Sequence, residues 1–384
     1  MTTAAAAAAA RTGGAAASPN GRNIYMDKLG LRPVINGVGT VTVLGGSIMP
    51  PEVVDAMAQA SRYFVSMPEL HDKVAERIVQ LLKVPAAMVS CGAASAIACG
   101  ASACLAGGDP KKVAQLPDTT GLKNEIVLQR SHRSGYEAQM LLTGAKFVWV
   151  ETRADLDRAI GERTAMMFFL NKEDPVGKIK RAEWIEVAKA RGVPTFLDAA
   201  ADVPPVERLT SYVQEGFDLV TFSGGKGLLG PQSSGLLLGR KDLVDAARRG
   251  ISPNGGVGRG MKVGKEEMIG LLVALERYLK TDHAAERRTL EARAAHVLKA
   301  LSDVAGVQAE QEVPEIANRV PHVHVRFDEA RVKRTSAQVL EQLREGDPPI
   351  IITRVGPGEL RISMWMLQGD EHKIVAKRLR EVLS

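Results

Sequence analysis

The chain has 384 residues, of which 45% are hydrophobic and 24% are charged, a balance typical of a globular protein with a large domain and a smaller one. Aromatic residues make up only 4% while glycines number 37, so the core depends on aliphatic side chains, which favours α/β layers over an aromatic-rich β-sandwich. The formal net charge of +6 is not gathered into a block of like charges, which excludes a nucleic-acid-binding signature and leaves an attraction to small anions.

Residues 1–27 are rich in alanine, glycine and serine and predict a disordered tail. The first basic residue, Arg11, follows the alanine run, whereas a secretory signal carries positive charge before its apolar stretch; a remnant of an export signal is the alternative. Residues 28–51 are rich in glycine and proline and predict an extended N-terminal arm. Since no apolar run approaches the roughly 18 residues of a membrane span, we expect no membrane partner.

Residues 52–285 predict a large domain. Residues 52–82 carry apolar positions at helical spacing, with a break near Pro68, and short apolar runs then alternate with amphipathic segments as far as residue 238. Near-continuous apolar runs of this length are typical of a parallel sheet covered on both faces, so we expect a doubly wound α/β structure. The strand candidates are AAMVS, EIVLQ, KFVWVE, AMMFFL, PTFLDA, FDLVTFS and GLLLG, and helix candidates between them include Glu137–Thr143, Arg153–Ile160 and Ala182–Arg191.

Residues 286–384 predict a smaller C-terminal domain. Long helices are expected over residues 266–303, followed by the strand candidates PHVHVRF, PIIITRV and ELRISMWM and by a last helix from Asp370. The predicted fold class is therefore α/β, with a large, mostly parallel-sheet domain and a small α+β domain.

Three cysteines, Cys91, Cys99 and Cys104, fall within one Ala/Gly-rich segment. Their spacing matches neither a zinc ribbon nor a redox C-x-x-C pair, so we expect no metal site. An odd number of cysteines predicts free thiols in a reducing compartment, which indicates a cytoplasmic protein.

Gly92, Ala93, Ala94 and Ser95 follow the run AAMVS and open a helix candidate. Small residues at a helix start leave backbone N–H groups exposed at the positive end of the helix dipole, and this arrangement binds phosphate. Because any Ala-rich helix start has a similar pattern, an ordinary helix is the alternative.

The run PTFLDA contains Asp198 at the carboxyl edge of the expected sheet, where open α/β sheets bind ligands. A carboxylate there can keep the ring nitrogen of a pyridine-type cofactor protonated. The alternative is an aspartate that caps the following helix.

Lys226 stands 28 residues after Asp198, in a turn between two strand candidates, with four glycines close by: Gly224, Gly225, Gly227 and Gly230. Glycines let a turn wrap closely around a ligand, which favours a functional lysine over the alternative of a surface loop. Ser223 can add a hydroxyl to the phosphate site. A phosphate loop, a carboxylate and a lysine in this order predict a pyridoxal-5′-phosphate (PLP) enzyme in which Lys226 holds the cofactor as a Schiff base.

The pattern S-x-x-K-x-x-x-G-P-x-x-x-G, preceded by an apolar strand ending D-A-A, resembles fold type I PLP enzymes. It is similar to their selenocysteine-synthase-like group, which includes L-seryl-tRNA selenium transferase and D-glucosaminate-6-phosphate ammonia-lyase. The resemblance runs from about Lys28 to Ser384 and includes QRSHRSGYE, NKEDPVG, GVGRGMKVGKEE and LRISMWML. It implies that PLP is the cofactor, that Asp198 contacts the pyridinium nitrogen and that Gly92–Ser95 form the phosphate loop.

The resemblance also assigns roles to His132 and Arg361. His132, after EIVLQ, is implied to stack its ring on the pyridine, with a plain surface histidine as the alternative. Arg361, in LRISMWML, is implied to bind the substrate carboxylate through two hydrogen bonds, with a solvated strand arginine as the alternative.

Two further loops enter the predicted site. Glu173 and Asp174 follow AMMFFL near the expected O3′ side of the cofactor, where Asp174 is expected to contact substrate; helix capping is the alternative for both. Arg259 and Lys262 are candidates to reach the cofactor phosphate across a dimer interface. Fold type I relatives close each site with residues of a neighbouring subunit, so we expect a homodimer or a higher homo-oligomer.

These roles imply an ammonia-lyase type α,β-elimination on a small hydroxy-amino acid or amino sugar acid, giving a 2-oxo acid and ammonia. Relatives that act on tRNA carry an added N-terminal domain, whereas this region is a short Ala/Gly tail without stacking aromatics, so we expect no nucleic-acid partner. A racemase or aminotransferase would use the same Lys226 and Asp198, and a non-catalytic regulatory protein would keep the fold. An NAD-binding protein is disfavoured because no G-x-G-x-x-G opens a helix after the first strand.

Overall fold

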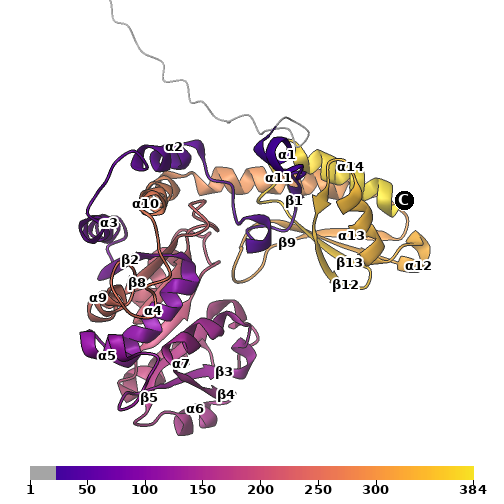
Figure 1. Ribbon diagram of the computed structural model, residues 1–384. Coiled ribbons are helices and arrows are strands. Elements are labelled where there is room, and N and C mark those ends of the chain that lie inside the picture. The colour runs from indigo at the N-terminus through magenta and orange to yellow at the C-terminus, as the bar shows by residue number, and fades with distance from the viewer. Residues whose placement is uncertain (1–22) are drawn as a thin grey trace, which may run out of the picture. The chain divides into compact units, whose positions relative to one another are not determined.

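The computed structural model describes residues 23–384, which form two units (Figure 1). The large unit consists of residues 40–284 and 313–320. The small unit consists of residues 23–39, 285–312 and 321–384. In the described part of the chain, no helix is long and apolar enough to cross a membrane.

The large unit is built on a seven-stranded sheet in the order β2-β8-β7-β6-β5-β3-β4. Only β8 runs antiparallel to its neighbours; every other pairing in this sheet is parallel. All seven strand candidates of this region are confirmed: β2 (Ala86–Ser90), β3 (Glu125–Gln129), β4 (Lys146–Val150), β5 (Thr164–Leu170), β6 (Thr195–Asp198), β7 (Leu219–Ser223) and β8 (Gly235–Gly239).

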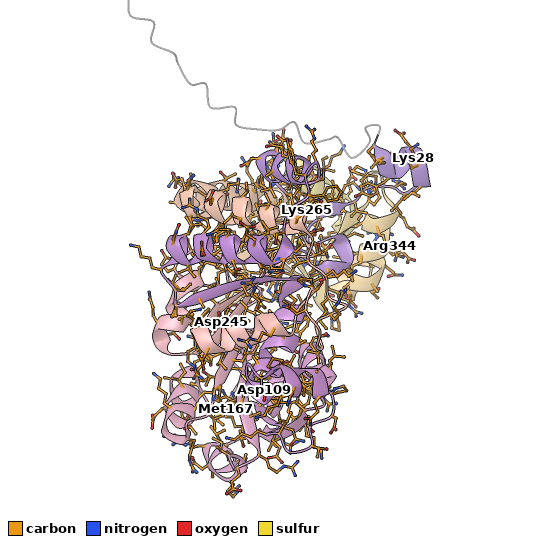
Figure 2. All side chains as sticks on the ribbon, turned by 60° about the vertical axis from the view of Figure 1, so that its left-hand side comes forward. Lys28, Asp109, Met167, Asp245, Lys265 and Arg344 are labelled. Atoms are coloured by element: carbon orange, nitrogen blue, oxygen red, sulfur yellow. The ribbon has the colours of Figure 1, made fainter. Side chains whose placement is uncertain are left out.

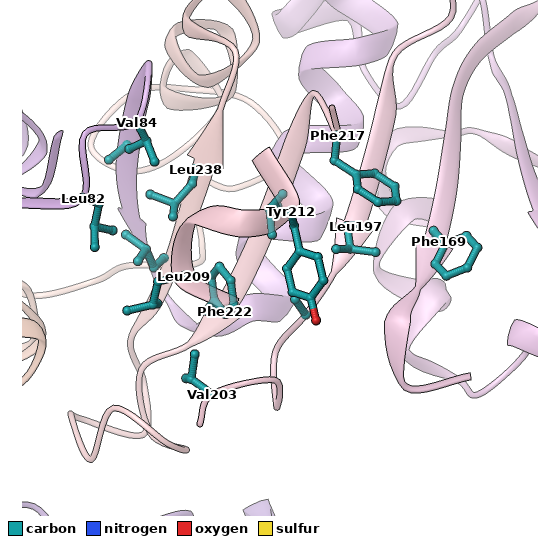
Figure 3. Packing of buried hydrophobic residues seen from close by; sticks show 14 of the residues in the cluster. Leu82, Val84, Phe169, Leu197, Val203, Leu209, Tyr212, Phe217, Phe222 and Leu238 are labelled. Carbon is teal, nitrogen blue, oxygen red and sulfur yellow. The ribbon is translucent and has the colours of Figure 1, made fainter. Parts of the chain in front are cut away.

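Helices cover both faces of this sheet, and the strands bury both sets of side chains, as their continuous apolar runs predict. One face packs against α4 (Gly92–Ala106), α5 (Pro110–Gln115) and α9 (Lys241–Arg249); Asp109 and Asp245 in Figure 2 mark the last two. Figure 3 shows part of the core on the other face, formed with α3 (Met67–Leu82), α6 (Arg153–Ala159), α7 (Arg181–Arg191), α8 (Arg208–Glu215) and α10 (Lys265–Lys280). The helix α2 (Pro51–Ala60) precedes α3.

Local sequence explains where several of these helices begin and end. α7 ends at Gly192, which adopts the left-handed conformation (φ 61°) and donates its N–H to the carbonyls of Ala188 and Lys189. α6 begins with a capping box between Thr152 and Asp155. The predicted helix Glu137–Thr143 is a 3₁₀ helix instead, η3 (Tyr136–Thr143).

The small unit holds a four-stranded antiparallel sheet in the order β12-β13-β10-β9. The predicted strand PIIITRV is divided into β11 (Ile350–Ile351), which pairs with β1 (Ile35–Asn36), and β12 (Thr353–Gly356). The strand β9 is absent from the prediction because four of its six residues, VQAEQE, are polar and none is fully buried, so it lacks an apolar run. The remaining elements are α1 (Ile24–Leu29), α11 (His283–Leu301), β9 (Val307–Glu312), β10 (His322–Phe327), α12 (Glu329–Val332), α13 (Ser336–Glu345), β13 (Glu359–Ser363) and α14 (Glu371–Leu383).

The N-terminal segments depart from the prediction of a tail followed by an extended arm. Residues 1–22 lie outside the described residues, but residues 24–29 form α1, in which Asn23 caps the first N–H groups. Ile35 and Asn36 pair with the small unit, whereas residues 40–46 belong to the large one. The segment is divided because β1 completes a two-stranded sheet before the chain continues to α2.

Gly235 permits the close approach of β8 to the start of α4. A Cβ at this position would lie 2.4 Å from the carbonyl carbon of Gly92 and 2.6 Å from the nitrogen of Ala93. We expect Gly235→Ala to lower the free energy of unfolding by roughly 1–3 kcal/mol, because backbone atoms would have to move.

Urea denaturation followed by circular dichroism measures this effect. The matched control is Gly161→Ala, because a Cβ at Gly161 meets no atom within 4 Å and the variant should unfold within about 1 kcal/mol of the parent. Equal unfolding free energies for the two variants would contradict the close approach.

Candidate functional site

Three parallel strands end side by side at one edge of the large sheet. Leu170, the last residue of β5, pairs with Asp198, the last residue of β6, and Asp198 pairs with Thr221 of β7. The chain continues past β7 through Ser223, whose N–H donates to the carbonyl of Ala200 (3.2 Å). This carboxyl edge is where open α/β sheets bind ligands.

The strand register brings the predicted phosphate loop to the same edge. Gly235 of β8 pairs with Ser223 on one side and with Ser90 of β2 on the other. Neighbouring strands lie about 5 Å apart, so Ser223 and Ser90 are separated by roughly 10 Å. Because α4 begins at Gly92, its first turn and the end of β7 border the same space.

The turn that carries Lys226 is packed against the protein's own backbone. A Cβ at Gly227 would lie 1.9 Å from the carbonyl oxygen of Val203, and one at Gly225 would lie 2.4 Å from the Cα of Gln232. The Gly230 N–H donates to the Gly224 carbonyl (2.8 Å) and closes the turn. The glycines around Lys226 therefore allow the turn to be held tightly, next to the loop that follows Asp198.

Burial shifts the pKa values of Lys226 and Asp198 in opposite directions and favours the neutral form of both groups. Asp198 is only 5% exposed, and burial raises the pKa of its carboxyl, against a hydrogen bond from the Ala200 N–H (2.9 Å) and the attraction of Lys226. Burial lowers the pKa of Lys226, while the nearby carboxylates of Asp198 and Asp202 oppose this shift and Lys172 adds to it. A lysine whose neutral amine is favoured in this way is suited to nucleophilic attack.

The start of α4 fits a phosphate group. Its N-cap residue, Cys91, makes no capping hydrogen bond, and the first turn contains no acidic residue. The hydroxyl of Ser95 is buried without a nitrogen or oxygen partner. Its contact is a weak hydrogen bond with the Cys99 thiol, one turn along the helix. Free N–H groups and a buried hydroxyl at the positive end of a helix match an anionic ligand. With Lys226 and Asp198 on the same sheet edge, the residues present fit PLP.

The His132 ring is buried in this structure, and its stacking role stays a prediction. A ring that stacks on a cofactor needs an exposed face, but His132 is fully buried and meets the edge of Phe169 at 4.4 Å. Its Nδ1 accepts a hydrogen bond from the Leu170 N–H (3.2 Å), and its Nε2 lies 3.2 Å from the Gln129 amide nitrogen. The 3₁₀ turn η2 (Arg130–His132) thus buries the ring beside β5.

The loop after β5 places Asp174 beside a cation. The Oδ2 of Asp174 lies 3.7 Å from the Nε of Arg181, and its Oδ1 is buried without a partner. Glu173 lies near Lys172 (3.8 Å). The substrate role of Asp174 stays a prediction.

The contacts of Arg259 and Arg361 within their own units do not place either side chain at the carboxyl edge of the large sheet. Arg259 is exposed, and its loop packs against α4 at Cys99, two turns from Gly92, because Gly258 lies against the Cys99 side chain. Arg361 belongs to the small unit, where it pairs with Glu312. Lys262 lies exposed in the same loop as Arg259.

Sequence reasoning missed a buried polar cluster beside Asp198, formed by Asn171, Asp202 and Tyr212. The Nδ2 of Asn171 donates to Asp202 (2.5 Å) and to the hydroxyl of Tyr212 (2.8 Å), and that hydroxyl donates to Asp202 (2.9 Å). One signal was available, because Asn171 is the first residue after β5, next to the end of β6. Tyr212, on a separate helix, could not be assigned from spacing.

The three cysteines are free thiols, as predicted. Burial raises the pKa of Cys99 and of Cys104 to about 12, so both remain protonated at neutral pH. They act as packing residues in the helix that begins with the phosphate loop.

Burial also makes His132 a source of acid sensitivity. Burial, together with the positive charge of Lys180, lowers the pKa of the imidazole to about 4. An imidazolium would, moreover, face the N–H groups of Leu170 and Gln129. A pKa below that of the unfolded chain means that folding stability is lost as pH falls from 6.5 to 4, by about 3 kcal/mol for this residue.

We therefore expect His132→Gln to flatten the decline in unfolding free energy between pH 6.5 and pH 4, measured by urea denaturation at several pH values. His71, whose pKa burial also lowers to about 4, keeps part of the slope in the variant. If His132 instead stacked on the cofactor, the slope would persist and the absorbance of bound PLP would change.

Comparison with known proteins gives consistent matches. The family model for L-seryl-tRNA selenium transferase (SelA) matches residues 150–367. The chain is 32% identical over 373 residues to D-glucosaminate-6-phosphate ammonia lyase of Salmonella typhimurium, covering 94% of this chain and 98% of that enzyme. It is also 32% identical over 372 residues to 5′-C-glycyluridine monooxygenase-decarboxylase of a Streptomyces species, covering 92% and 91%.

A solved structure of D-glucosaminate-6-phosphate ammonia-lyase has a TM-score of 0.81 to this one at 31% identity, covering 94% of this chain and 98% of that chain. The predicted resemblance is therefore confirmed across both units, including the mainly parallel sheet and the C-terminal antiparallel sheet. The chain belongs to the SelA family of fold type I PLP-dependent enzymes.

Proposed function

We propose that this protein is a PLP-dependent lyase that removes ammonia from a small hydroxy-amino acid or amino sugar acid by α,β-elimination. The observation that supports this reaction type is the 32% identity to an ammonia lyase across 98% of that enzyme's length. The free thiols of Cys91, Cys99 and Cys104 suit a cytoplasmic location.

We infer that Lys226 holds PLP covalently and that Gly92–Ser95, with Ser223, bind its phosphate. Asp198 would accept a hydrogen bond from the ring nitrogen and keep it protonated. When bound, PLP supplies an electron sink for the charge left at the substrate α-carbon.

The chain's own residues supply the proton transfer. The Nζ of Lys226, once free, would take the substrate α-proton, since burial favours its neutral amine. The β-hydroxyl then leaves as water, the resulting enamine becomes an imine, and hydrolysis gives the 2-oxo acid and ammonia. The water lost in the first half is taken up in the second, so the reaction balances without an oxidant.

A relative of a second reaction class has the same sequence identity to this chain. The Streptomyces relative is named as a monooxygenase-decarboxylase, and it has the same 32% identity to this chain as the lyase, over slightly less of both proteins. That class differs in consuming oxygen and releasing carbon dioxide. Racemisation and transamination would also use Lys226 and Asp198, and a non-catalytic protein would bind PLP without turning over any amine.

We propose that the protein acts as a homodimer or a higher homo-oligomer. The loop of Arg259 packs against α4 at Cys99 and leaves the Arg259 side chain exposed, and a guanidinium can bind phosphate through two hydrogen bonds. We therefore assign it to the phosphate of the neighbouring subunit. Arg361 and Asp174 remain our candidates for the substrate carboxylate and polar groups.

The first test concerns the cofactor. We expect the purified protein to bind PLP and borohydride to fix the pyridoxyl group on Lys226, mapped by mass spectrometry, while neighbouring Lys172 stays unlabelled. Lys226→Ala should keep its unfolding midpoint and lose the adduct. An adduct on another lysine would refute the assignment of Lys226.

The second test concerns the reaction. A screen of hydroxy-amino acids and amino sugar acids should show ammonia and 2-oxo acid in equal amounts, with no oxygen uptake. Asp198→Asn should slow exchange of the substrate α-proton with deuterated water by roughly 10²-fold, because a neutral ring stabilises negative charge less well.

Asp218→Asn is the matched control for Asp198→Asn, because Asp218 precedes β7 at the opposite edge of the sheet and should not affect the exchange. Oxygen uptake coupled to carbon dioxide release would favour the monooxygenase-decarboxylase class. Exchange in Asp198→Asn at the parent rate would remove Asp198 from the site.

A further inference from the structure

Asp202 is a second buried carboxylate at the cofactor edge of the sheet. It is 3% exposed, and its Oδ2 accepts hydrogen bonds from the Asn171 amide (2.5 Å) and the Tyr212 hydroxyl (2.9 Å). It lies four residues after Asp198, in a turn in which its N–H donates to the Ala199 carbonyl (3.0 Å). A buried carboxylate is costly unless a charge nearby compensates for its desolvation.

The turn that carries Lys226 lies against Asp202's own loop. Gly227 follows Lys226 and Val203 follows Asp202, and these two residues touch so closely that a Cβ on Gly227 would overlap the Val203 carbonyl. The charged groups that act on Lys226 are Asp198, Asp202 and Lys172. Two anions thus lie near one buried amine, although only Asp198 is required at the pyridine nitrogen.

The structure fixes Asp202 firmly in this position. The Oδ1 of Asn171 accepts from Arg181 (2.8 Å), so the Asn171 amide is held at both ends. The Tyr212 ring lies in the apolar core near Leu197 and Phe222 (Figure 3), with the guanidinium groups of Arg181 and Arg208 at 5.2 and 5.1 Å from its centre. Since these partners come from α7, α8 and the end of β5, the carboxylate cannot turn away from the site without breaking them.

We propose that Asp202 is a positioning residue for proton transfer: its carboxylate, held by Asn171 and Tyr212, stabilises the proton on the Nζ of Lys226. Burial makes Lys226 a weak base, and the negative charge of Asp202 restores part of its basicity at the moment when it takes the α-proton. This role rests on the proposed function of Lys226 as the base, but the electrostatic coupling itself does not depend on the substrate.

The coupling should switch on over a defined pH range. Burial raises the pKa of Asp202 to about 6, and the negative charge of Asp198 adds to this rise. The hydrogen bonds from Asn171 and Tyr212 and the positive charge of Arg181 act in the opposite direction. Asp202 is therefore anionic above about pH 6 and neutral below it. Asp202→Asn removes the anion at every pH, so it should resemble the parent protein only in acid.

The test measures the reactivity of Lys226 in the full chain after removal of bound PLP with hydroxylamine. Acetic anhydride acylates only the neutral amine, and mass spectrometry gives the rate at Lys226 relative to an exposed lysine. Asp202→Asn should react at least about threefold faster than the parent at pH 8, because one neighbouring anion is lost. The ratio should approach one at pH 5.

Two further variants complete the test. Tyr212→Phe removes one donor to Asp202, so its carboxylate keeps a proton to higher pH; the variant should match the parent at pH 5 and again well above pH 7, and react faster between these limits. It provides the measurement if Asp202→Asn fails to fold. Asp218→Asn, a carboxylate at the opposite sheet edge, should follow the parent throughout.

A ratio that is equal to one at all pH values, or raised by the same factor at all of them, would overturn the coupling. This outcome is distinct from failure of the proposed function. If no amino acid yields ammonia but the ratio rises above pH 6, Asp202 still controls Lys226 and the reaction type is wrong. If elimination is found with a flat ratio, the lyase stands and Asp202 has no such role.

Discussion

The contact between the turn of Lys226 and the loop after Asp198 is the constraint on which the site depends. Gly227 touches the Val203 carbonyl more closely than any side chain would permit. This contact places the lysine beside the ends of β6 and β7, where the register already aligns Asp198 with Thr221. The same sheet, through Gly235, admits the start of α4. A few glycines thus bring together a lysine, a carboxylate and the helix start that is predicted to bind phosphate.

The electrostatics of this edge follow from burial. Desolvation favours the neutral form of every ionisable group, so it lowers the pKa of Lys226 and raises the pKa values of Asp198 and Asp202. Each charge is then tolerated only through its neighbours. A cofactor with an anionic phosphate and a basic ring nitrogen suits this arrangement, because it provides partners for the helix end and for Asp198.

Membership of the family does not determine the reaction type, which depends on residues other than Lys226, Asp198 and Gly92–Ser95. The chain belongs to the SelA family, yet it matches a lyase and a monooxygenase-decarboxylase at the same 32% identity. The groups that hold the substrate and admit or exclude oxygen must therefore differ among such enzymes. Asp174, with one buried oxygen lacking a partner, is our proposed position of this kind in the chain.

The sequence by itself determined the seven strands of the large sheet, because each is a short apolar run whose length and continuity depend on burial at both faces. It also predicted that Asp198, Gly92–Ser95 and Lys226 lie at one sheet edge, since Asp198 ends β6, Gly92 and Lys226 follow β2 and β7 within three residues, and parallel strands end at the same edge. Only the tertiary structure decided that His132 is buried against Phe169, because the path of a 3₁₀ turn is not encoded in local spacing.

The tertiary structure likewise decided the partners of Asp202, since Asn171 and Tyr212 lie 31 and 10 residues away along the chain and meet it only through packing. It placed residues 313–320 in the large unit, where the Asn318 N–H donates to the Ala201 carbonyl (2.8 Å). Hydrogen bonds between distant segments have no periodic pattern in the sequence, whereas strands and helix ends do.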